Sequence, residues 1–126
     1  MPNVFESFKK SVVRLQEIMS AEQTVANRDS AIQRFEFTYE LSWKSLKRYL
    51  QDQGIVALTP RACFMEAFRI GIISDDEQWI RMGKDRNMTV HTYDETFAQQ
   101  VYERIRGYLP LFEKLEKELE QRNTNF

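Results

Sequence analysis

The sequence holds few of the residues that build disulfides, metal sites or tight turns. Its 126 residues include one cysteine, one histidine, three prolines and four glycines. A single cysteine, Cys63, excludes a disulfide within this sequence and is typical of a reducing compartment. One cysteine and one histidine cannot supply the four ligands of a structural zinc site, so we expect no metal and no cofactor. Few glycines and prolines leave little room for tight hairpins, which favours helices over strands.

Long apolar runs and excess charge are also missing. No apolar run approaches the ~20 residues of a membrane span, and the first ten residues lack the apolar stretch of a signal peptide. The net charge is -1, so a polyanion would have to bind a local patch instead of an overall field. We therefore expect a cytoplasmic protein without a membrane partner, with one domain over residues 1–122 and a frayed tail at 123–126.

Apolar residues recur at steps of three and four along the chain, which predicts five helices. Their expected ranges are 3–23, 30–53, 60–71, about 75 into the 83–95 stretch, and 93–122. Gly54 should end the second helix, and Pro110 should kink the last one near Arg106. The predicted fold is all-α: an antiparallel up-and-down bundle with long hairpin arms and two short helices packed across them.

Helix starts are marked by residues whose side chains accept hydrogen bonds from free backbone amides. Thr59 precedes Pro60, and two pairs have capping-box spacing, Ser74 with Glu77 and Thr92 with Glu95. Residues 26–29 are polar and predict a loop, in which an asparagine or an aspartate could cap the second helix. Within that helix, Glu40 and Lys44 have the spacing of a favourable ion pair.

The segment 83–95, GKDRNMTVHTYDE, contains the side chains best suited to binding and catalysis. Arg86 carries a permanent positive charge, His91 has an imidazole that can take up or release a proton, and Tyr93 follows two residues later. On one continuous helix Arg86 and His91 would point about 140° apart. A helix break between them would let both side chains face one cleft.

Arginine and histidine together suit phosphodiester chemistry. Arg86 could bind phosphate oxygens in a bidentate way, and His91 could exchange a proton with a ribose 2′-hydroxyl or with the leaving oxygen. That combination predicts metal-independent RNA cleavage. The alternative is that the lone histidine is a packed or surface residue. Arg81 and Lys84, with Arg86, form a predicted basic patch that is either a phosphate site or a solvated face.

The segment from Arg86 to Tyr93, R-N-x-x-x-H-x-Y, resembles the signature of the HEPN superfamily, and more closely its HepT branch, the nucleotidyltransferase substrate-binding protein family. The likeness continues in residues 29–44, DSAIQRFEFTYELSWK, and at Pro60-Arg61, at residues 66–68 and at Trp79. It covers roughly residues 5–115. The resemblance implies a HEPN-like bundle that dimerises and a neighbouring nucleotidyltransferase of the MNT type as partner.

The resemblance implies two functions. In the first, the chain is the RNase toxin of a toxin–antitoxin pair: Arg86 and His91 are catalytic, and Asn87, Lys84 and Arg81 bind the substrate. The partner nucleotidyltransferase then neutralises it by adding AMP to Tyr93. In the second, the chain is a non-catalytic substrate-binding subunit of a two-chain nucleotidyltransferase. A structural bundle without activity is the third alternative.

Two further expectations concern aromatic residues. Nine Phe, five Tyr and two Trp are hard to bury in one small bundle, which predicts a homodimer that hides the surplus. Trp43 and Trp79 are expected in the core instead of serving as stacking platforms for bases. Tyr93, without the family resemblance, would be a half-buried packing residue with its hydroxyl in water.

Overall fold

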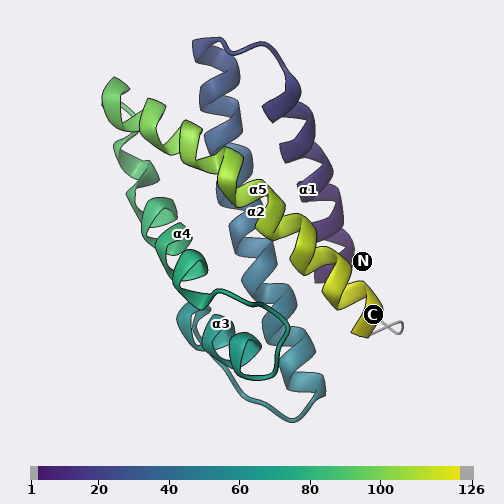
Figure 1. Ribbon diagram of the computed structural model, residues 1–126. Helices are drawn as coiled ribbons and strands as arrows, with labels where there is room; N and C mark the ends of the chain where they lie inside the picture. Colours follow the sequence, from purple (N-terminus) through teal and green to yellow (C-terminus); the bar gives the residue numbers. More distant parts are fainter. Residues whose placement is uncertain (1–2, 123–126) are drawn as a thin grey trace.

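The computed structural model describes residues 3–122, and these form five α-helices and one short 3-10 turn, with no strand among them (Figure 1). The elements are α1 (Val4–Ser20), α2 (Val25–Asp52), α3 (Pro60–Arg69), α4 (Asp76–Met88), η1 (Thr89–His91) and α5 (Glu95–Arg122). The all-α prediction is therefore confirmed. The predicted tail, residues 123–126, lies outside the described residues.

Several predicted helix boundaries are wrong, because other side chains supply the caps. The predicted loop at 26–29 is helical: Thr24 accepts a hydrogen bond from the Asn27 amide and starts α2 five residues early. Asp75 caps α4 through the Gln78 amide in place of Ser74. Asp94 accepts from the Phe97 amide in place of Thr92, so α5 begins at Glu95.

Two helices end just before a glycine that has a left-handed backbone conformation. Gly54, with φ of 79°, follows the end of α2 as predicted, and Gly71, with φ of 82°, follows α3. The first helix ends at Ser20, three residues before the predicted end. Pro110 lies inside α5, which stays helical on both sides of it. The kink near Arg106 remains a prediction.

The helices surround one core. α1 and α2 form an antiparallel hairpin, α5 crosses its face diagonally, and α3 and α4 lie beside α2 (Figure 1). Aromatic rings connect these layers at the centre: Trp79 of α4 lies 4.8 Å from Phe64 of α3 and 5.5 Å from Phe112 of α5, between ring centroids. Phe112 in turn lies 6.3 Å from Phe35 of α2. These contacts fix the depth at which α4 packs.

The expectation that one chain cannot bury its aromatic residues is wrong. Most rings, including Trp79, are buried within a single chain, whereas Trp43 is only partly buried. Phe37, Phe68 and Tyr93 are the described rings left largely exposed. The aromatic count by itself therefore gives no reason for a dimer.

A buried carboxylate joins α4 to α5. Asp85 accepts two hydrogen bonds from the Arg104 guanidinium, at 2.8 and 2.9 Å, and a third from the Tyr108 hydroxyl at 2.5 Å. Burial, followed by the neighbouring Asp85 carboxylate, raises the pKa of Tyr108 well above its usual range. The tyrosine therefore stays a donor, and the carboxylate has partners on both oxygens.

Within residues 3–122, no helix combines the length and the apolar character that crossing a membrane requires.

The Asp85 network generates a stability prediction. Asp85→Ala leaves Arg104 and the buried Tyr108 hydroxyl without their acceptor, so it should lower the free energy of unfolding by about 2–3 kcal/mol in chemical denaturation. Asp52→Ala is the matched control: it breaks only an exposed pair with Arg48, at 3.6 Å, and should cost less than about 0.5 kcal/mol. Equal losses in the two variants would contradict a special role for Asp85.

Candidate functional site

The helix break predicted inside the 83–95 segment is present. α4 ends at Met88, and η1 carries the chain through His91 before α5 begins. Thr89, which is buried, donates a 2.7 Å hydrogen bond from its hydroxyl to the Arg86 carbonyl and so caps the end of α4. Arg86 is thus on the last turn of a helix, and His91 is on the turn that follows.

The side chain of Arg86 points toward α2, where it meets Glu40. Arg86 Nε lies 3.0 Å from Glu40 Oε1, yet this buried nitrogen makes no hydrogen bond to a described residue. The contact is therefore an ion pair without a well-aligned N–H. The other oxygen of Glu40 accepts from Trp43 Nε1 at 3.1 Å. The predicted partnership of Glu40 with Lys44 is wrong, because Arg86 occupies that role.

His91 and Tyr93 lie together on the exposed turn. His91 Nδ1 and the Tyr93 hydroxyl oxygen are 3.3 Å apart, within hydrogen-bond distance, and their rings are arranged edge to face. Tyr93 is 81% exposed, so the half-buried packing role considered for it is wrong. Both side chains are open to a ligand or to another protein.

No hydrogen bond or ion pair joins Arg86 directly to His91 within residues 3–122. The turn is instead held from its far side by Arg28, which is 5% exposed. Arg28 donates to Asp29 of its own helix and, at 2.8 Å, to Glu95 at the start of α5. This pair fixes where the chain leaves the turn, and sequence inspection missed it because Arg28 fell in the predicted loop.

The predicted basic patch is divided between two hollows. Lys84 and Asn87 line a pocket of about 290 Å³ between α2, α3 and α4, next to Glu40. Arg81 lines a different hollow, between α4 and α5, together with Arg104. Arg81 and Lys84 therefore do not belong to one site in this chain.

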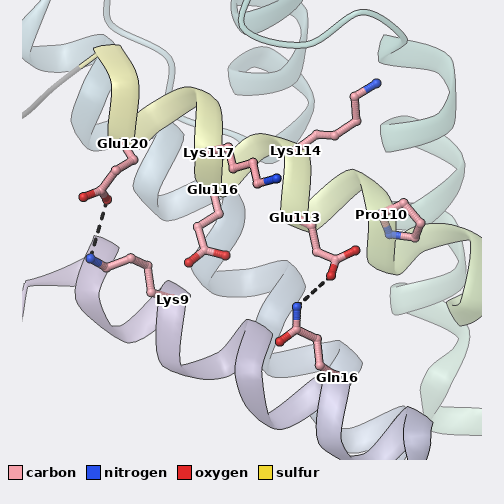
Figure 2. Close-up of a pocket in the computed structure, with 8 residues that line it drawn as sticks. All are labelled: Lys9, Gln16, Pro110, Glu113, Lys114, Glu116, Lys117 and Glu120. Atoms are coloured by element: carbon pink, nitrogen blue, oxygen red, sulfur yellow. Dashed lines mark hydrogen bonds and ion pairs between the residues drawn. The ribbon is translucent and has the colours of Figure 1, made fainter.

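A larger hollow than the one beside Glu40 lies away from the motif. It measures about 490 Å³ between α1 and α5, and Figure 2 shows its mixed charges. Lys9 pairs across it with Glu120 at 3.5 Å, and Gln16 donates to Glu113 at 2.7 Å. Its cations and carboxylates neutralise one another, and it contains none of the predicted site residues. Size alone therefore does not locate the functional site.

Residues 3–122 contain no group of three or more His, Cys, Asp or Glu side chains arranged to hold a metal ion. Cys63 is fully buried in α3 and donates to the Ala57 carbonyl at 3.5 Å. Burial raises the pKa of its thiol to about 11. Cys63 is therefore a packing residue, as a nucleophile would need a lower pKa and access to solvent.

An all-α bundle with an arginine on a helix end, followed by an exposed histidine and tyrosine, defines a helical domain with a polar site at one interhelical turn. The model of the family described as "Nucleotidyltransferase substrate binding protein like" matches residues 3–121. The chain belongs to this family, which confirms the family resemblance of its sequence.

Individual relatives agree with that assignment. The chain is 42% identical, over 98 residues, to a Haemophilus influenzae protein named "Probable ribonuclease HepT"; the match covers 74% of this chain and 67% of that protein. A crystal structure from Thermus thermophilus has a TM-score of 0.78 at 31% identity, covering 91% of this chain and 97% of the other. A Haemophilus influenzae structure, described as revealing the fold of a substrate binding domain of a nucleotidyltransferase, has a TM-score of 0.72 at 33% identity and covers 93% and 94%.

Proposed function

We propose that the chain is a metal-independent ribonuclease of the HepT type, which a partner nucleotidyltransferase controls by AMP transfer. The observation that carries the proposal is the turn after α4: it presents His91 and Tyr93 to solvent and follows the helix whose last turn carries the ion-paired Arg86. The relative named as a probable ribonuclease supports the same assignment. Lys84 and Asn87, on the adjoining face of α4, are proposed substrate contacts, whereas the position of Arg81 argues against that role for it.

The proposed chemistry is transfer of the RNA phosphodiester to the neighbouring 2′-oxygen. The 2′-oxygen forms a bond to phosphorus while the bond to the 5′-oxygen breaks, which leaves a cyclic phosphate and a free 5′-hydroxyl. His91 takes the proton of the 2′-hydroxyl or gives one to the departing oxygen. The terminal nitrogens of Arg86 make no hydrogen bond to described residues, so they are available for the phosphorane charge while Glu40 holds Nε.

Cleavage depends on His91 in this proposal. His91→Ala should lower the rate of cleavage of a labelled RNA by about a hundredfold or more, because it removes a proton-transfer group. The exposed side chain contributes little to packing, so the unfolding temperature should stay unchanged. Val90→Ala, on the same turn and also exposed, is the matched control and should cleave normally. EDTA should have no effect; cleavage that requires metal, or that survives in His91→Ala, would contradict the mechanism.

Tyr93 is the proposed acceptor of AMP. Its hydroxyl is exposed and lies 3.3 Å from His91 Nδ1, so an adenylyl group on that oxygen would place a phosphate against the histidine. Substrate phosphate would then be excluded sterically and by charge. The helix dipole of α5 adds little to this effect, because Asp94 and Glu95 already bring negative charge to that helix start.

The modification has a direct measurement. The chain co-expressed with the nucleotidyltransferase encoded beside it should gain the mass of one or more AMP units, whereas Tyr93→Phe should gain none and remain an active RNase in the presence of the partner. Tyr102→Phe is the matched control, since that tyrosine is 1% exposed and should not affect modification. An unmodified wild-type chain held tightly by the partner would favour inhibition by binding alone.

The second candidate is a substrate-binding subunit of a two-chain nucleotidyltransferase. The family description and the wording attached to one of the solved structures favour it. Its partner is again a nucleotidyltransferase, but the chain would position a nucleotide substrate without cleaving RNA. The two functions separate in one assay: the ribonuclease cleaves RNA in the absence of the partner, and the substrate-binding subunit does not.

We also propose a homodimer, on grounds other than the aromatic count. Each chain has one histidine, whereas phosphodiester transfer uses both a base and an acid, and a two-fold pairing would supply a second His91. Large apolar side chains, including Phe37, Phe68 and Met65, remain exposed on the single chain. Light scattering at micromolar concentration should give about twice the chain mass, and a monomer throughout a dilution series would reject the dimer.

A further inference from the structure

The pocket beside Glu40 has the composition of a site for a flat ring with an attached anion. It lies between α2, the start of α3 and α4, and has a volume of about 290 Å³. The rings of Tyr39 and Phe64 contribute its apolar side, and Pro60 and Ile80 add further apolar surface. Arg61 and Lys84, both exposed, bring positive charge to the opening.

The hydroxyl of Tyr39 borders the pocket beside Gly83. Tyr39 is 5% exposed, yet its hydroxyl makes no hydrogen bond to any described residue. Burial raises the pKa of Tyr39 to about 12, so the hydroxyl is neutral and able to donate. Its oxygen is not fully buried, so it can donate to a molecule in the pocket.

Gly83 makes room for this hydroxyl. A Cβ atom at position 83 would lie 2.6 Å from the Tyr39 oxygen, closer than such atoms approach one another. Gly83 lines the same pocket as Tyr39. The glycine therefore leaves room for this polar atom at the wall of the pocket, where a ligand can reach it.

The position of the pocket relative to Arg86 suggests what the ligand is. Glu40 lines the pocket and also holds Arg86. Asn87, the next residue along, lines it as well and offers an amide that can both donate and accept. The first turn of α3 starts at Pro60, which has no N–H, and its Ala62 amide already donates to Thr59, so the positive charge for an anion there comes from the Arg61 side chain. A ligand with a flat ring, a hydrogen-bonding edge and a phosphate would therefore find a partner for each of these groups in the pocket.

We propose that this pocket binds one nucleotide unit, with its base against Tyr39 and Phe64 and its phosphate at Arg61 and Lys84. The proposal deepens the ribonuclease function and rests on it, since a base bound here would direct the next phosphate of the strand toward Arg86. The unit could belong to an RNA strand or to a free mononucleotide such as AMP, and both present the same base and phosphate.

Binding without cleavage is the test. The probes are AMP, measured by calorimetry, and a short fluorescent 2′-O-methyl oligonucleotide, measured by anisotropy; the methylated strand has no 2′-hydroxyl and cannot be cleaved by the proposed route. Tyr39→Phe should weaken binding roughly three- to tenfold, because it removes one hydrogen bond. Arg61→Gln should weaken it by about tenfold and reduce its salt dependence.

Matched controls separate the pocket from general effects. Tyr102→Phe removes a buried hydroxyl that accepts from Arg106 at 3.4 Å, outside the pocket, and Arg69→Gln removes a cation on the same helix as Arg61. Both should bind the probes like the wild type. Tyr39→Phe breaks no hydrogen bond to a described residue, so its unfolding temperature should equal that of the wild type.

Each outcome decides the proposal. Weaker binding of either probe in the two pocket variants supports it: an effect on the oligonucleotide alone identifies a strand site, and an effect on AMP identifies a site that also takes the free nucleotide. Absence of binding in the wild type, or unchanged affinity in both pocket variants, overturns it even if the chain cleaves RNA. A wild-type chain that binds through the pocket but never cleaves would contradict the ribonuclease function and leave the pocket in place.

Discussion

The ion pairs and hydrogen bonds of Asp85 hold α4 in one orientation, and every proposed function of the chain depends on that orientation. A helix presents successive residues about 100° apart, so fixing one residue fixes the direction of its neighbours. With Asp85 directed at Arg104 and Tyr108 of α5, Arg86 is directed at α2, and Lys84 and Asn87 at the pocket beside α3. The contacts of one buried carboxylate thus set which polar residues of α4 face α5, which face α2 and which face the pocket beside α3.

The turn after α4 is held at both ends while its middle remains exposed. Thr89 is buried and bonded to the last turn of α4, and Arg28 binds Glu95 where α5 begins. Between these two anchors His91 and Tyr93 are exposed and do not pack in the core. Such an arrangement suits residues that must meet a substrate or a modifying enzyme, because the backbone is positioned and the side chains remain accessible.

Glu40 connects the two parts of the proposed site. It neutralises Arg86 in the free chain, it accepts from Trp43, and it lines the pocket that contains the Tyr39 hydroxyl. In the guanidinium of Arg86, Nε is therefore paired with the Glu40 carboxylate, whereas the two terminal nitrogens make no hydrogen bond to described residues and can bind a phosphate. This balance lets a permanent positive charge sit at a partly buried position without an anionic ligand.

The sequence by itself determined the helical fold, the approximate position of each helix and the motif from Arg86 to Tyr93. Apolar periodicity and residue order are local properties, so these predictions needed no knowledge of contacts. Helix starts were predicted less well, since Thr24, Asp75 and Asp94 competed with neighbouring residues that could also cap. Tertiary structure alone decided that Arg86 pairs with Glu40, that Arg81 and Lys84 face different hollows, and that Tyr39 reaches Gly83. Each of these outcomes depends on how one helix is rotated against another. That rotation is set by contacts between residues far apart in the sequence, such as those of Asp85 with Arg104 and Tyr108 of α5.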